Sequence, residues 1–158
     1  MRTAHWILVL NVLLFVTSIW FVLAGARGAG AAAPASESVS TVKQIMDGII
    51  GPASGTVYRS VSIMVSAEGE QENYPRTDRE WEIVAASAAA IAEAGHLLMS
   101  EKHLRDTEAW AKMSQAMIDA SLISMKAAQD KDKEAVLASG EALNASCDGC
   151  HRRYMVDE

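Results

Sequence analysis

Apolar residues recur at every third or fourth position in several stretches of the chain, the spacing that places side chains on one face of an α-helix. The first stretch carries Val39, Val42, Met46, Ile49 and Ala53. Within it stands Gly51-Pro52, and because proline lacks a backbone N–H and clashes with the preceding turn, this helix should be kinked or split there. A second helical piece starting at Pro52 is expected to carry Val57, Val61 and Met64.

Three more helices are predicted beyond a polar connection, AEGEQENYP. Thr77 and Glu80 have capping-box spacing and should open the next helix. Its buried stripe comprises Trp81, Val84, Ala88, Ile91, Gly95 and Leu98. A third helix carries Trp110, Met113, Met117, Ala120 and Ala127. The last carries Val136, Gly140, Leu143, Cys147, Cys150 and Tyr154. Four helices with short links predict an all-α, antiparallel four-helix bundle.

The N-terminus is a separate apolar segment that runs from Trp6 to Ala26. A helix of about 20 residues, at about 1.5 Å each, covers about 30 Å, the thickness of a bilayer core. The small residues after it suit either signal cleavage or a flexible tether. A retained anchor and a cleaved signal both stay open. We divide the chain into a membrane anchor or signal segment at 1–27, a tether at 28–37 and a helical domain at 38–158.

Composition agrees with a single helical domain after that segment. Hydrophobic residues make up 50% of the chain while aromatics reach only 6%, and the surplus is largely alanine, which favours helices. The formal net charge is −6, and no long basic run is present. Binding to a nucleic-acid backbone therefore has no electrostatic support.

The only two cysteines stand in the pentapeptide CDGCH, at Cys147 and Cys150, directly before His151. This is the C-x-x-C-H pattern of c-type haem attachment. Two thiols add to the porphyrin vinyl groups as thioethers, and the adjacent imidazole reaches the iron. A structural zinc site would need two further ligands. A thioredoxin-like redox pair belongs to a βαβ context, which an alanine-rich helix does not supply.

With CDGCH near the C-terminus, Tyr154 three residues after the histidine and Met46 on an early helix, the chain resembles the class II c-type cytochromes, the cytochrome c′ and cytochrome c-556 group. The resemblance spans about residues 38 to 156 and implies one covalent haem c on the last of four helices. In the cytochrome c-556 branch a methionine of the first helix is the second axial ligand, which Met46 matches. The family often has a basic residue after the tyrosine, where this chain has Met155.

The second axial ligand separates two functions. Met46 opposite His151 predicts a one-electron carrier, whereas a five-coordinate haem would bind or sense small gases such as NO or CO. The other candidate methionines, Met64, Met99, Met113 and Met117, are expected to pack around the ring. His96 and His103 are expected on the solvated flank of their helix. No nucleophile, base and orienting group emerges, so we expect a protein that is not an enzyme.

The expected partners follow from the charge and from the N-terminal segment. An acidic carrier suits a redox partner protein with a basic docking surface. The apolar segment predicts contact with a membrane, and export places the haem domain on the periplasmic side of a bacterial inner membrane. The sequence leaves the oligomeric state open, a homodimer included.

Overall fold

The computed structural model describes residues 5–7, 11–20, 39–106 and 108–155. The chain divides into two compact units, Met1–Glu37 and Ser38–Glu158. In the first unit, residues 11–20 are helical. Among the described residues, no helix is long and apolar enough to cross a membrane. Part of the apolar run at 6–26, and all of the expected tether at 28–37, lie outside the described residues.

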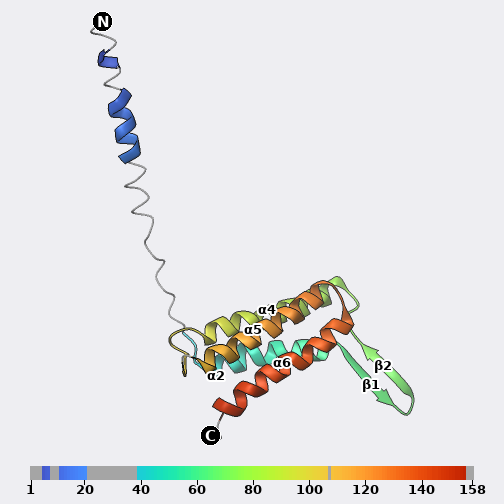
Figure 1. Cartoon of the computed structure of the whole chain (residues 1–158). Helices are drawn as coiled ribbons and strands as arrows, with labels where there is room; N and C mark the ends of the chain where they lie inside the picture. Colours follow the sequence, from blue (N-terminus) through green and yellow to red (C-terminus); the bar gives the residue numbers. More distant parts are fainter. Residues whose placement is uncertain (1–4, 8–10, 21–38, 107, 156–158) are drawn as a thin grey trace. The chain divides into compact units, whose positions relative to one another are not determined.

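The second unit is mostly helical, as predicted, and also contains one small antiparallel sheet (Figure 1). Its elements are α2 (Val42–Ile45), the π-helix η1 (Met46–Ile50), α3 (Gly51–Ser60), β1 (Ser62–Ser66), β2 (Gly69–Asn73), α4 (Asp78–Leu98), α5 (Ala109–Gln129) and α6 (Lys133–Tyr154). Helix α4 packs along α5, and α5 packs along α6. Helix α3 contacts both α4 and α6.

The sheet is a correction to the all-α prediction. Val61 and Met64 were expected to continue a helix, but Val61 is extended (φ −130°, ψ 126°) and ends α3, and Met64 lies in β1. The polar stretch that was expected to be an irregular connection supplies β2. A β-branched or apolar run of five residues fits a strand as well as a helical turn, and pairing with β2 decides between them.

The predicted interruption at Gly51-Pro52 takes the form of a π turn immediately before the proline. The Gly51 N–H donates to the carbonyl oxygen of Met46, five residues earlier. Buried Ile45 and Ile50 are accordingly five positions apart, so the predicted spacing of three and four does not hold across this turn. Val39, which was expected on the inward stripe, is 93% exposed.

The predicted inward stripes of α4 and α5 are confirmed, whereas in α6 only Val136 and Leu143 of the six predicted positions are buried and the other four are half-buried. All six predicted positions of α4 are buried, as are four of the five predicted for α5. The buried side chains form two clusters. The cluster that we call the central core comprises Ile45, Ile50, Ala53, Val57, Ala88, Ile91, Ala94, Leu98, Trp110, Met117, Ala120 and Leu143. The second, near the hairpin, comprises Val61, Trp81, Val84, Ala127, Ala128 and Val136.

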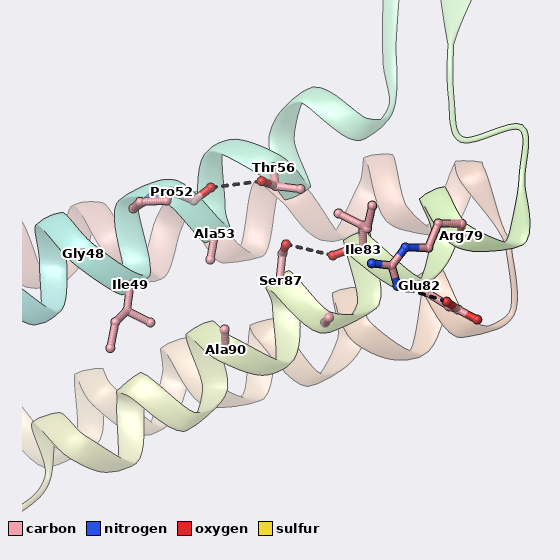
Figure 2. A pocket seen from close by; sticks show the side chains of 11 residues that line it. Gly48, Ile49, Pro52, Ala53, Thr56, Arg79, Glu82, Ile83, Ser87 and Ala90 are labelled. Carbon is pink, nitrogen blue, oxygen red and sulfur yellow. Dashed lines mark hydrogen bonds and ion pairs between the residues drawn. The ribbon is translucent and has the colours of Figure 1, made fainter.

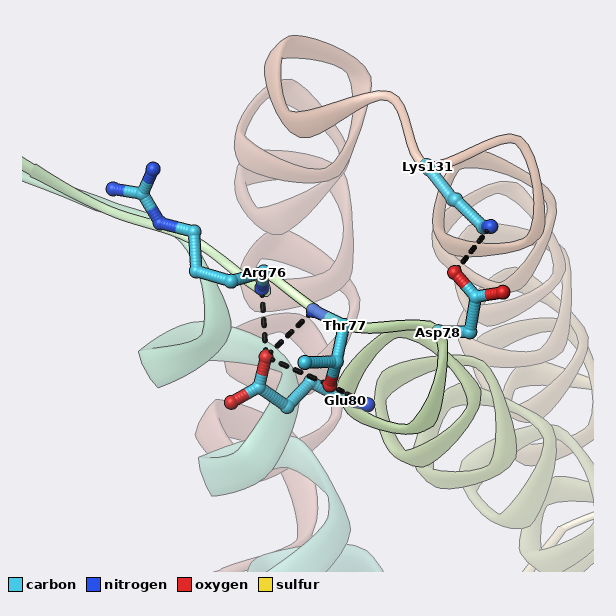
Figure 3. A network of polar contacts seen from close by, with 5 residues as sticks. All are labelled: Arg76, Thr77, Asp78, Glu80 and Lys131. Atoms are coloured by element: carbon cyan, nitrogen blue, oxygen red, sulfur yellow. Dashed lines mark hydrogen bonds and ion pairs between the residues drawn. The ribbon is translucent and has the colours of Figure 1, made fainter.

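Helix α4 begins with the predicted capping box (Figure 3). The Thr77 hydroxyl accepts from the Glu80 N–H at 3.2 Å, and the Glu80 carboxylate accepts from the backbone N–H groups of Arg76 (2.7 Å) and Thr77 (2.9 Å). These hydrogen bonds stabilise the ionised carboxylate and lower the pKa of Glu80. Lys131, just after α5, donates to Asp78 at 2.7 Å and joins the two helix ends.

Candidate functional site

The CDGCH motif lies in the last two turns of α6. Its two cysteines are three residues apart, a little less than one helical turn, so both sulfurs leave the helix on the same side. Cys147 and Cys150 are half-buried free thiols, and His151 is exposed. The inner face of α6 that leads to the motif is buried through Val136 and Leu143. The helix thus presents two sulfurs toward the other helices and an imidazole beside them.

Tyr58 of α3 lies against this part of α6. A Cβ atom at Gly140 would stand 3.7 Å from the Tyr58 ring, an ordinary contact distance. Burial, followed by the neighbouring Cys147, raises the pKa of Tyr58 to about 12. Tyr58 was not predicted as a site residue, because it lies beside the apolar stripe of α3.

Cys150 and Met46 pack against the same hydrophobic cluster from different elements. Both are partly buried side chains that contact the central core, together with Tyr154 of α6. Met46 is the first residue of η1, so the π turn begins where the predicted ligand stands. π turns inside α-helices occur frequently at functional sites. The structure therefore brings Met46 and Cys150 to one core across about 100 residues of chain.

Tyr154 fastens the end of α6 to the loop between α4 and α5. Its hydroxyl donates to the Asp106 carboxylate, and its ring meets Trp110 edge-on at 4.9 Å between centroids. Asp106 also accepts from the Trp110 N–H at 2.9 Å and lies 3.7 Å from Arg153. The Tyr154 hydrogen bond is the main reason that the pKa of Asp106 is lowered. This contact fixes the turn of α6 that carries His151.

The two thiols are held in their neutral form. Burial is the main cause that raises the pKa of both Cys147 and Cys150. They also lie at the C-terminal end of α6, where the helix dipole disfavours a negative charge. Reactive redox thiols depend on a lowered pKa and often lie at helix N-termini. The surroundings of this pair are those of buried thiols and do not activate a thiolate.

The histidines differ in exposure. His96 is exposed, as predicted, but the prediction that His103 is solvated is wrong, because its ring is only 4% exposed. Its Nε2 lies 2.7 Å from the Ser40 carbonyl oxygen, and its Nδ1 lies 2.8 Å from the Leu97 carbonyl oxygen and 3.0 Å from the Ser100 hydroxyl. His103 therefore joins the segment before α2 to the α4–α5 loop, and both ring nitrogens are engaged.

The other methionines are placed unequally around the central core. Met64 is 66% exposed on the hairpin, so the expectation that it packs around a haem ring is wrong. Met117 is buried within the central core, and Met99 and Met113 are half-buried. Met125, which the sequence analysis did not consider, packs against the same core. Helices α5 and α6 run antiparallel, with Ser124 beside Ser139 and Trp110 beside Tyr154, so Met113 and Met117, and not Met125, lie at the level of the CDGCH motif.

A groove lies between the η1–α3 segment and α4 (Figure 2). Small and apolar side chains line most of it, among them Ile49, Ala53 and Ala90. The two hydroxyl groups in the groove form hydrogen bonds within their own helices: Thr56 donates to the backbone carbonyl of Pro52 at 3.1 Å, and Ser87 donates to that of Ile83 at 2.8 Å. None of the lining residues belongs to α6. The groove is thus separate from the CDGCH motif.

In the part of the chain that the structure describes, no group of three or more His, Cys, Asp or Glu side chains is placed to hold a metal ion. A haem iron takes at most two protein ligands, so a haem site does not require such a group. Comparison of the chain with protein-family models, with curated proteins and with solved structures gave no match.

Proposed function

We propose that this protein is a c-type cytochrome that carries single electrons through one covalent haem, attached by Cys147 and Cys150 and ligated by His151 and Met46. One observation carries the proposal. CDGCH ends α6 with its sulfurs directed inward, and Met46 of a distant element packs against the same central core as Cys150. The resemblance to class II c-type cytochromes supports the same assignment.

The residues at the motif fit a haem c group. Cys147 and Cys150 would hold the haem by thioether bonds: net addition of each S–H across a vinyl group places the sulfur on one carbon and the hydrogen on the other, and needs no oxidant. The raised pKa values of both thiols and their half-burial do not suit thiolate redox chemistry. When bound, the haem supplies one-electron exchange between two iron oxidation states.

The protein's own contribution is to hold two ligands and to shield the ring. Tyr154, tied to Asp106 and Trp110, keeps the last turn of α6 and hence His151 in place. The central core supports Met46 and Cys150 from the inside. A thioether ligand together with an imidazole favours electron transfer over gas binding. On this basis we propose no catalytic residue.

We further propose that α2–η1–α3, α4, α5 and α6 correspond to the four helices of a cytochrome c′-like bundle. The packing of α4 on α5, of α5 on α6 and of α3 on both α4 and α6 supports this correspondence. The apolar N-terminal segment supports placement on the periplasmic side of a membrane, as an anchor or a signal. The net charge of −6 supports a redox partner with a basic docking surface.

The test is the haem itself. The full chain, produced with a haem-attachment system, should retain haem through acid extraction and a denaturing gel, and Cys147→Ser or Cys150→Ser should weaken that retention. A wild-type protein that loses all haem under these conditions overturns the proposal.

Met46→Ala then tests the second ligand, with Met64→Ala as the matched control on the exposed hairpin. Met46→Ala should turn a low-spin ferric spectrum high-spin, admit carbon monoxide and lower the reduction potential, while Met64→Ala should leave all three unchanged. If the wild-type haem is already high-spin in both oxidation states, the gas-binding function replaces electron transfer. If Met46→Ala stays low-spin, Met117, which is buried in the central core at the level of the motif, is the next residue to replace.

A further inference from the structure

The hairpin of β1 and β2 projects from the helices at the end away from the CDGCH motif (Figure 1). Lys133, at the start of α6, donates to Glu72 of β2 at 2.5 Å, whereas the motif lies at the other end of that helix. Within the described residues the sheet has only these two strands, so each strand has an unpaired outer edge. We propose that two copies of this chain join through the outer edges of their β1 strands, forming a four-stranded sheet about a two-fold axis.

The register of the hairpin determines which backbone groups the outer edge of β1 offers. Ser66 pairs with Gly69 across a two-residue turn, a position where the pair exchanges hydrogen bonds. Because the direction of the backbone groups alternates along a strand, Met64 also points its N–H and C=O toward β2. Ile63 and Val65 therefore direct theirs to the outer edge, and their side chains are 47% and 79% exposed.

These outward groups match those of a second copy. With a two-fold axis at Met64, Ile63 of one copy faces Val65 of the other, and Val65 faces Ile63. Each of these two pairs exchanges two N–H···O bonds, so all four outward donors and acceptors of each β1 are used. Ile63 and Val65 share one face of the strand, so the pairing also brings four apolar side chains together.

The charges favour the β1 edge over the β2 edge. The sequence of β1, SIMVS, has no charge and no proline, the features with which free edges are usually protected. Strand β2 carries Glu70 opposite Val65 and Glu72 opposite Ile63. In the proposed sheet the two β2 strands are outermost, about 14 Å apart, which exceeds a Debye length of about 8 Å at physiological salt. Pairing through β2 would instead set Glu70 of each copy against Glu72 of the other, and of these two carboxylates only Glu72 is paired with Lys133.

Disulfide trapping tests the two-fold axis. At the axis the two Met64 residues form a non-hydrogen-bonded pair with Cα atoms about 4.5 Å apart, within the range of a disulfide. Full-length, haem-loaded Met64→Cys in mild detergent should therefore form a reducible dimer under gentle oxidation. Gln71→Cys is the matched control, since Gln71 faces Met64 within the hairpin and lies on the outer strand of the proposed sheet. Equal trapping of both variants, or trapping of neither, overturns the proposal.

Proline substitution tests the hydrogen bonds in the same full-length protein. Val65→Pro removes one outward N–H from each copy and none from the β1–β2 ladder. It should raise the dissociation constant of the dimer about tenfold or more, measured by sedimentation equilibrium in density-matched detergent. Glu70→Pro, the matched change on the opposite edge, should leave the dimer intact. A wild-type protein that sediments as a monomer at every concentration, or equal weakening by both prolines, refutes the pairing.

Discussion

Helices α4 and α5 approach each other closely at Gly95, and Gly95→Ala should be costly there. A Cβ atom at this position would lie 2.4 Å from Cγ1 of Ile118, 3.1 Å from its Cδ1 and 3.3 Å from Cε of Met117. Ordinary contacts begin at 3.4 Å, and Ile118 is only 2% exposed, so either the isoleucine leaves its rotamer or the helices separate by about 1 Å.

Two opposing effects determine how much Gly95→Ala changes the free energy of unfolding. Overpacking in a core costs about 1–3 kcal/mol, and the overlap at Gly95 places this case near the upper end. Replacing glycine by alanine within a helix stabilises the folded state by about 0.5–1 kcal/mol, because alanine loses less conformational freedom on folding. Gly95→Ala should therefore lower the free energy of unfolding by about 2 kcal/mol, measured by urea denaturation of the haem-loaded protein.

Two further variants make the test specific. Gly48→Ala has nothing within 4 Å of its new Cβ and should raise the free energy of unfolding by about 0.5–1 kcal/mol. In an Ile118→Ala background, Gly95→Ala should lose most of its cost, because the two nearest atoms are gone and only Cε of Met117, the end of a flexible side chain, remains at 3.3 Å. A Gly95→Ala protein as stable as wild type, or one equally destabilised in both backgrounds, would show that α4 and α5 do not approach this closely in solution.

Three other outcomes are expected. Thr77→Ala removes the cap of α4 and should lower the free energy of unfolding by about 1 kcal/mol in urea denaturation; an unchanged midpoint contradicts the cap. Tyr154→Phe should lower the thermal midpoint at neutral pH. The hydrogen bond that lowers the pKa of Asp106 stabilises the fold above the unfolded carboxyl pKa of about 4, and this stabilisation is lost as the pH falls through the lower pKa of the folded state. Acidification should therefore lower the thermal midpoint of Tyr154→Phe less than that of the wild type. Thermal melts of both proteins at neutral and at acidic pH check this. Gly51→Ala would bring a Cβ to 3.0 Å from the Met46 carbonyl, and the disturbed π turn should raise the high-spin fraction of the ferric spectrum; an unchanged spectrum would show that the turn does not position the ligand.

Features that depend on local pattern were predicted well from the sequence. The capping box at Thr77 and Glu80 needs only residues three apart, and the stripe of α4 repeats at regular helical spacing. The position of Cys147 and Cys150 on one side of the last helix likewise follows from their spacing of three. In these elements the local helix propensity and the burial pattern favour the same structure, so a single sequence is enough to predict them.

Features that depend on distant contacts were missed. The burial of His103 requires the Ser40 carbonyl, which is 63 residues away in the chain. The hairpin depends on a register between β1 and β2 in which β2 has little apolar character of its own. The prediction assumed 3.6 residues per turn throughout the first helix, but the π turn has a longer period. The predicted buried face is therefore wrong around Ile45 and Ile50.

The contact between His103 and Ser40 also determines how the second unit responds to mechanical load. Any pull on the chain from the N-terminal side enters this unit just before Ser40, whose carbonyl is held by a buried ring that is itself anchored in the α4–α5 loop. That loop is fixed in turn to α6 through Asp106 and Tyr154. Tension applied before Ser40 is thereby shared between the α2–η1 segment, the α4–α5 loop and the end of α6.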